Sequence, residues 1–282
     1  MRNYYDFISV AYIVVYLVAI VSQWWLGFSW PLFAISLVTV VCLQVVHHNH
    51  VHLGIWHSRR MNRLTNLLIS LATAVPTAML YGGHLKNHHV HNHGPGDTTR
   101  TYRFGGDHNH LLGYLLHPFQ ALFVLIPKFC REFWEGWPTR SRFSRDLLLQ
   151  STLVGILSLG LLWLDWQNFL LLVLVPQLFG VHWLLGSNYL QHAHCDDQSD
   201  VNYARNFTGP INYLLLNVGF HTAHHDNPRA HWSTLRQIHE RTISEMDPRL
   251  CCPSFAGYLF RTFFLGIFFE SYRSRSLRNP VE

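Results

Sequence analysis

Residues 7–46 read FISVAYIVVYLVAIVSQWWLGFSWPLFAISLVTVVCLQVV, and none of these 40 residues is Asp, Glu, Lys, Arg or His. A helix crosses the hydrocarbon core of a bilayer with about 20 apolar residues, so this stretch has room for two spans. The turn between them is expected at Gly27–Pro31, where glycine and proline interrupt the apolar pattern. The sequence therefore predicts two membrane-crossing helices, at about 7–26 and 32–52.

A second apolar region covers residues 147–189, where Asp165 and His182 are the only charged or histidine side chains. It predicts two more spans, at about 147–164 and 168–188. The whole chain is 49% hydrophobic and 13% charged, against about a quarter charged in an ordinary soluble domain. We therefore predict an all-α, multi-pass integral membrane protein, in which residues 1–282 form one domain.

Three shorter apolar segments make the number of spans uncertain between four and six. Residues 64–81 have no charge but contain several polar side chains and Pro76, which favours an interfacial or re-entrant segment broken near the proline. Residues 111–127 and 257–269 are also apolar and short, so we place them at the membrane interface. Six spans would result if two of these segments paired into a further hairpin. The residues from Ser271 onward have the composition of a solvated end.

The positions of the basic residues predict the orientation of the spans. All 21 Lys and Arg residues lie at position 2, within 59–145, or from 205 onward. Basic residues concentrate in cytoplasmic loops, so both termini and the segments 53–146 and 189–282 are expected in the cytoplasm. The net charge of +5 is then a consequence of membrane orientation, and no nucleic-acid partner is expected.

The 21 histidines of the chain gather in clusters beside the predicted spans. Residues three or four apart share one face of a helix, and each cluster contains such a pair. Asn188 and His192 form a further pair at the end of the last span. The histidines that these patterns bring together are His48, His52, His84, His88, His89, His192, His221, His224 and His225. One zinc ion uses four protein ligands, or three and a water, so nine imidazoles suit two metal ions.

The motifs H-x3-H (48–52), H-x3-H-H (84–89), N-Y-L-Q-H (188–192) and H-x2-H-H (221–225) resemble those of the membrane fatty acid desaturase and alkane hydroxylase superfamily. The stretch NVGFHTAHHDNPRAHW, residues 217–232, is similar to the third histidine box of that family. The resemblance implies a four-helix membrane cone and a cytoplasmic helical cap that holds two non-haem iron ions. The co-substrate implied is O2.

Four further residues are candidates for a ligand or an outer contact of the metal site. His47 would give the H-x4-H spacing of acyl-CoA desaturases, although His48 keeps both imidazoles on one helical face. Asn188 precedes His192, and His231 stands in a context similar to that of the third box. Asp226 is one of several carboxylates that could accept a hydrogen bond from a metal-bound imidazole; the others are Asp107, Asp196 and Asp197.

The resemblance also implies a substrate and partners. The substrate would be a long fatty acyl or other lipid chain, and the surrounding membrane lipid is a further partner. The sequence contains no C-x-x-C-G pair and no H-P-G-G motif, so electrons are expected from a separate ferredoxin, rubredoxin or cytochrome b5 with its reductase. We favour desaturation over hydroxylation and over oxidative decarboxylation to a terminal alkene. A divalent-metal transporter or sensor is the remote alternative, because its ionisable residues would be expected inside the spans.

Overall fold

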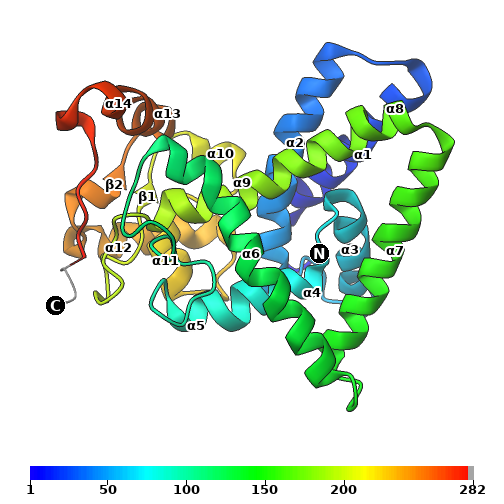
Figure 1. Ribbon diagram of the computed structural model, residues 1–282, viewed down its shortest axis with the longest axis horizontal. Helices are drawn as coiled ribbons and strands as arrows, with labels where there is room; N and C mark the ends of the chain where they lie inside the picture. Colours follow the sequence, from blue (N-terminus) through cyan, green and yellow to red (C-terminus); the bar gives the residue numbers. More distant parts are fainter. Residues whose placement is uncertain (279–282) are drawn as a thin grey trace. The chain divides into compact units, whose positions relative to one another are not determined.

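The computed structural model describes residues 1–278, which divide between two compact units (Figure 1). The first unit contains residues 1–85 and 127–184, and the second contains residues 86–126 and 185 onward. The chain passes from one unit to the other within η1 (Tyr81–His88), α6 (Leu111–Gly136) and α9 (Val175–His192). Among the described residues the only sheet is a pair of two-residue strands, so the predicted all-α class is confirmed.

The first unit begins with the predicted hairpin, formed by α1 (Asp6–Leu26) and α2 (Trp30–His52). The α1 helix ends at Gly27, whose φ of 93° favours glycine over any residue with a Cβ atom. Pro31 lies in the first turn of α2, where its missing N–H is not needed for a helical hydrogen bond. The two helices pack side by side, and the buried amide of Gln23 donates to the Ser36 hydroxyl at 3.4 Å.

The predicted break near Pro76 is present, between α3 (Arg59–Thr73) and α4 (Thr77–Leu80). The chain bends there by 99°. Backbone groups freed by a break need new partners, since the bilayer core offers no water. The Gln177 amide donates to the carbonyls of Leu71 and Ala72, each at 3.3 Å, and the Gln150 side chain accepts from the Ala78 N–H at 2.9 Å. Side chains from α7 and α9 thus stabilise the broken segment.

Within residues 1–278, five helical runs are long and apolar enough to cross a membrane, or six if the bent pair counts as one span. Four correspond to the predicted spans: α1, α2, α7 (Arg142–Leu164), and the run from α8 (Trp166–Asn168) through η2 (Phe169–Leu174) to α9. The fifth is α6, which continues beyond the apolar stretch expected at 111–127. Its charged last turns carry the i, i+4 pairs Lys128–Glu132 and Arg131–Glu135, which support helix where hydrophobicity ends.

The second unit is made of short elements. Strands β1 (Asn206–Phe207) and β2 (Cys251–Cys252) pair in parallel, with Asn206 opposite Cys251. The helical elements of this unit outside α6 and α9 are α5 (His89–His91), α10 (Ile211–Leu214), α11 (His221–Asp226), η3 (Trp232–Thr234), α12 (Leu235–Thr242), η4 (Ile243–Glu245), η5 (Pro248–Leu250), α13 (Phe255–Leu259), η6 (Phe260–Leu265), α14 (Gly266–Phe268) and η7 (Glu270–Tyr272).

Two small apolar cores hold the second unit together. Tyr189 and Leu190, near the end of α9, pack with Phe207 of β1 and Phe263 of η6. Phe220, Ala223 and Leu235 form the other core, which fixes α11 against α12. Both cores contain sequence neighbours of the histidine motifs, since Tyr189 and Leu190 precede His192 and Phe220 and Ala223 flank His221. Their packing therefore fixes the backbone that carries these imidazoles.

Candidate metal centre

Four of the predicted histidines gather within the second unit: His88, His192, His221 and His225. Each offers a ring nitrogen, and these nitrogens all lie within 4.8 Å of one another. The Nε2 atom of His221 is 3.0 Å from that of His192 and 3.2 Å from that of His225. His192 is the last residue of α9, and His221 and His225 lie one turn apart on α11. We name these residues the second-unit quartet.

The spacing of the quartet fits metal ligands better than hydrogen-bonded imidazoles. A neutral imidazole nitrogen either donates one hydrogen or accepts at one lone pair, so Nε2 of His221 cannot bond well to both neighbours. Two nitrogens about 2.1 Å from a common ion lie about 3.0 Å apart at right angles and about 3.4 Å apart at the tetrahedral angle. The separations of 3.0 and 3.2 Å lie in this range. The quartet therefore fits a metal site.

Contacts outside the quartet fix the orientation of two of its rings. The Nδ1 atom of His88 lies 2.6 Å from Oδ2 of Asp97, a fully buried carboxylate. The Nδ1 atom of His192 lies 2.9 Å from the backbone carbonyl of Tyr203. An acceptor at Nδ1 places the hydrogen there and leaves the lone pair of Nε2 for a metal. The two rings are thus held in the tautomer that ligation through Nε2 needs.

The loop that carries Asp97 is itself fixed by hydrogen bonds. Thr99 donates to Oδ1 of Asp97 through both its N–H and its hydroxyl, at 2.7 and 2.8 Å. The N–H of His93 donates to Oδ2 at 3.0 Å, and the Asn188 amide donates to the Thr99 carbonyl at 2.7 Å. Burial acts to raise the pKa of Asp97, but its interactions with His88 outweigh burial and leave the pKa well below its usual range. The carboxylate stays charged and able to accept.

The end of α9 has a cation at its carbonyl groups. The buried guanidinium of Arg205 donates to the carbonyls of Leu190 at 2.7 Å and Ala193 at 3.0 Å, and it lies over the ring of Tyr258. A positive charge at a helix C-terminus is favourable because the last carbonyls point toward it. Arg205 therefore stabilises the turn of helix that presents His192.

Two rings of the quartet, His192 and His225, are in an environment that lowers their pKa values and favours the neutral form. Burial lowers the pKa of His225 well below its ordinary value, and the neighbouring rings of His221, His89, His88 and His192 lower it further. Only the neutral ring has the lone pair that binds a metal. Charged imidazoles this close together would repel one another, whereas neutral rings can lie close together and bind one metal ion.

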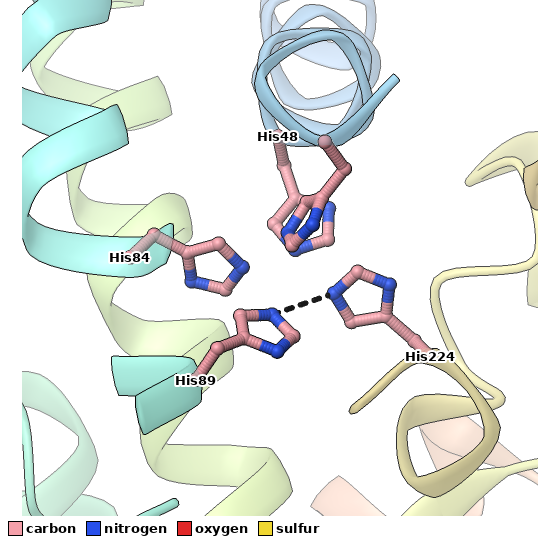
Figure 2. A group of neighbouring side chains, drawn as sticks. His48, His84, His89 and His224 are labelled. Carbon is pink, nitrogen blue, oxygen red and sulfur yellow. Dashed lines mark hydrogen bonds between the residues drawn. The ribbon is translucent and has the colours of Figure 1, made fainter. Parts of the chain in front are cut away.

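Three predicted histidines gather within the first unit: His48, His52 and His84. We name them the first-unit triad. The ring centroids of His48 and His52, one turn apart on α2, are 5.0 Å apart, and His84 of η1 is 4.4 Å from His48 and 5.0 Å from His52. Figure 2 shows the rings of His48 and His84. The Nδ1 atom of His48 lies 3.1 Å from the Asn49 side-chain oxygen.

The remaining two predicted histidines, His89 and His224, approach each other within the second unit. Their Nε2 atoms are 3.1 Å apart, as the dashed line in Figure 2 marks. His89 lies next to His88 at the start of α5, and His224 is on α11 beside His225. All nine predicted histidines therefore lie beside others of the set, in a triad, a pair and a quartet. Their roles as ligands remain a prediction.

The structure places the four further candidates elsewhere. The Nε2 atom of buried His47 lies 2.9 Å from the Thr77 hydroxyl, so this ring braces α4 while His48 stands with the triad. Asn188 holds the Thr99 carbonyl, as described above. The Nδ1 atom of His231 accepts from the Ser233 N–H at 3.2 Å, and His231 thereby caps the N-terminus of η3. Asp226 accepts a hydrogen bond from the Tyr203 hydroxyl.

Two residues near the quartet were not singled out by the sequence. Asp97 follows Gly94-Pro95-Gly96 and had only the appearance of a loop residue. His93 is fully buried, and its ring stacks on His192 with centroids 5.0 Å apart. Burial lowers the pKa of His93 to about 3. The sequence signal for Asp97 was its position nine residues beyond His88, and spacing alone does not rank it above the other carboxylates.

Comparison with known proteins agrees with this geometry. The chain matches the family model described as fatty acid desaturase over residues 22–258, a range that includes all nine histidines. No curated protein and no solved structure gives a significant match. The match covers most of the chain, and the apolar helices and histidine groups are those that such a membrane oxidoreductase requires. The chain therefore belongs to the fatty acid desaturase family.

Proposed function

We propose that the protein is an O2-dependent desaturase of a long-chain fatty acyl substrate, and that the whole chain works as one desaturase-like domain. The observation that carries this proposal is the quartet, in which His88, His192 and His221 are buried and the tautomers of His88 and His192 are fixed, in a chain of the fatty acid desaturase family. Removing hydrogen from an unactivated methylene requires a metal oxidant, because no side-chain base is strong enough. Acid–base catalysis by the histidines alone would not suffice.

Nine imidazoles are enough for two iron ions. We propose that the quartet holds one of these two ions. Bound iron would supply the activation of O2 that breaks the C–H bond. The role of this chain is to present the imidazoles, to keep Nε2 of His88 and His192 available through Asp97 and the Tyr203 carbonyl, and to bury His88, His192 and His221 away from bulk water.

The overall reaction fixes what the partners must supply. A –CH2–CH2– unit, one O2, two electrons and two protons give –CH=CH– and two water molecules. The electrons would come from a separate ferredoxin, rubredoxin or cytochrome b5 with its reductase. The acyl chain would come from the membrane in which the spans lie.

The product identifies the reaction. Purified protein is supplied with iron, a reductase chain, O2 and an acyl substrate, and the product is analysed by mass spectrometry. A loss of two hydrogens with about two irons per chain is expected. A gain of one oxygen would show a hydroxylase, and a loss of one carbon with a terminal alkene would show a decarboxylase. Zinc uptake into vesicles without oxidation would contradict enzymatic function altogether.

We further propose that both termini and the histidine groups face the cytoplasm, on the evidence of the Lys and Arg positions. Single cysteines at positions 2, 94, 27 and 167, in a chain without its five natural cysteines, test this orientation by labelling with an impermeant thiol reagent. Positions 2 and 94 should be labelled from one side and positions 27 and 167 from the other. Labelling of 94 and 2 from opposite sides would contradict the re-entrant arrangement of α3 and α4.

A further inference from the structure

Residues 274–278 are not a solvated end, because they make specific contacts within the second unit. The Ser274 hydroxyl lies 2.7 Å from Nδ1 of His194, and the Leu277 N–H donates to the His194 carbonyl at 3.0 Å. The Ser276 hydroxyl donates to the carboxylate of Asp107. His194 follows His192 by two residues. The tail is therefore attached to the segment that leaves the metal centre.

Arg278 makes the strongest of these contacts. Its Nε atom donates to Oδ1 of Asp197 at 2.8 Å, and the two side chains are 15% and 1% exposed. Its guanidinium carbon lies 3.5 Å from the ring centroid of Tyr102, and the Tyr102 hydroxyl donates to Oδ2 of Asp197 at 3.0 Å. Burial and the charge of Asp197 raise the pKa of Tyr102 to about 12, so its hydroxyl remains a donor. One arginine thus joins the tail, the loop after Asp97, and the segment after His192.

Ring contacts continue from Tyr102 to the quartet. The edge of the Tyr102 ring meets His93, with centroids 5.4 Å apart and planes at 84°. His93 stacks on His192 at 5.0 Å with planes at 18°, and its Nε2 atom lies 3.2 Å from the Thr101 hydroxyl. Each ring in this series is packed against the next. A displacement of Tyr102 would therefore reach His192 through one intervening side chain.

We propose that Arg278 is a positioning residue for the metal centre, acting through Tyr102, Asp197 and His93 on the orientation of His192. This inference rests on the proposed function, since it assumes that His192 binds the metal. Removal of one partner from a buried ion pair leaves the other charge without compensation. Without Arg278, Asp197 would be such a charge, and the segment 192–197 would have to move to hydrate it. A more exposed pair such as Arg249–Asp247 is expected to contribute little, because solvent screens its charges.

The test compares variants of the full-length protein in their metal content and metal affinity, measured by chelator competition. Arg278→Ala should weaken binding at the quartet by roughly 10- to 100-fold, the usual effect of losing an outer contact. Arg275→Ala, an exposed arginine three residues away, is the matched control and should bind as the wild type does. Arg278→Lys keeps the positive charge but lacks the planar guanidinium that stacks on Tyr102, so it should give an intermediate loss of metal affinity.

A double variant separates positioning from general damage to the tail. If the uncompensated Asp197 causes the loss, then Asp197→Asn added to Arg278→Ala should recover most of the affinity. Equal losses in Arg278→Ala and Arg275→Ala would overturn the proposal, as would wild-type affinity in Arg278→Ala. Should Arg278→Ala fail to fold, Arg278→Lys and Tyr102→Phe take its place, and unchanged affinity in both would overturn it equally.

Hydrogen exchange gives a readout that does not depend on bound metal. Amides of residues 93–102 and 192–197 should exchange faster in metal-free Arg278→Ala than in metal-free wild type, and unchanged exchange would overturn the proposal. A wild-type chain that binds no iron would refute the proposed function. Faster exchange in the variant would still show, in that case, that Arg278 orders residues 93–102 and 192–197. The two failures are therefore distinguishable.

Discussion

The quartet of the second unit and the triad of the first unit contain the same side chain but are built differently. In the triad, two of three rings lie one turn apart on α2, and regular helix geometry brings them together. In the quartet, rings from η1, α9 and α11 meet, and a buried carboxylate and a backbone carbonyl fix two of them. The triad thus depends mainly on local structure, and the quartet depends on contacts distant in sequence.

This comparison has a physical consequence. A pair on one helical turn is preserved as long as the helix remains folded. A group assembled from separate elements loses its geometry when any one of several outer contacts is lost. Sensitivity to substitutions outside the ligand set should therefore be greater in the second unit.

The largest effect is expected from removal of a quartet ring. His221→Ala should lower metal affinity more than about 100-fold, above the usual effect of losing an outer contact, and abolish turnover. The reason is that Nε2 of His221 lies between those of His192 and His225. Metal analysis and product formation are the measurements, and His110→Ala, which lies outside both histidine groups, is the control. Equal losses in both variants would show that the quartet is not the ligand set.

A smaller effect is expected from outer contacts, and it distinguishes the two groups. Asp97→Asn should weaken metal binding by roughly 10- to 100-fold, because the charged acceptor at Nδ1 of His88 is lost. Asn49→Ala, which removes the neutral contact of His48 in the triad, should weaken it only about 2- to 10-fold, as for one neutral hydrogen bond. Chelator competition measures both. An effect of Asn49→Ala as large as that of Asp97→Asn would contradict the proposed difference between the groups.

The smallest effect concerns the stability of the second unit in acid. Burial lowers the pKa of His239, and within the described residues neither of its ring nitrogens has a hydrogen-bond partner. Below the unfolded pKa of about 6.5, the unfolded chain binds a proton that the folded chain does not, so stability falls as the pH decreases. The slope from this residue is at most about 1.4 kcal/mol per pH unit.

His239→Phe should remove that part of the acid sensitivity, and at neutral pH it should be neutral or stabilising by about 1 kcal/mol. Hydrogen exchange of residues 235–242 between pH 7.5 and 5.5 measures the change in the second unit alone. Peptides from α2, in the first unit, serve as an internal reference. Identical pH dependence in the variant and the wild type would mean that other groups cause the acid sensitivity.

Composition and periodicity were enough to predict the membrane class, the four main spans and the nine clustered histidines. These properties depend on composition and on short periodicities, which follow from the helix turn and the bilayer thickness. The preference for His48 over His47 came from the same source, since only His48 shares a helical face with His52. The length of α6 was harder to predict, because its last turns lie beyond the apolar stretch and depend on i, i+4 charge pairs.

The polar groups that contact the imidazoles could not be predicted, because they depend on tertiary packing. Asp226, Asp196, Asp197 and Asp107 could not be ranked from spacing, and the carboxylate that holds His88 is Asp97. Likewise, the burial of His93 against His192 and the contact of Arg278 with Asp197 join residues about 100 and 81 positions apart. Such contacts are determined by how loops pack around α9 and α11. No local periodicity encodes that packing, because a loop residue gains its partner only when the chain has folded.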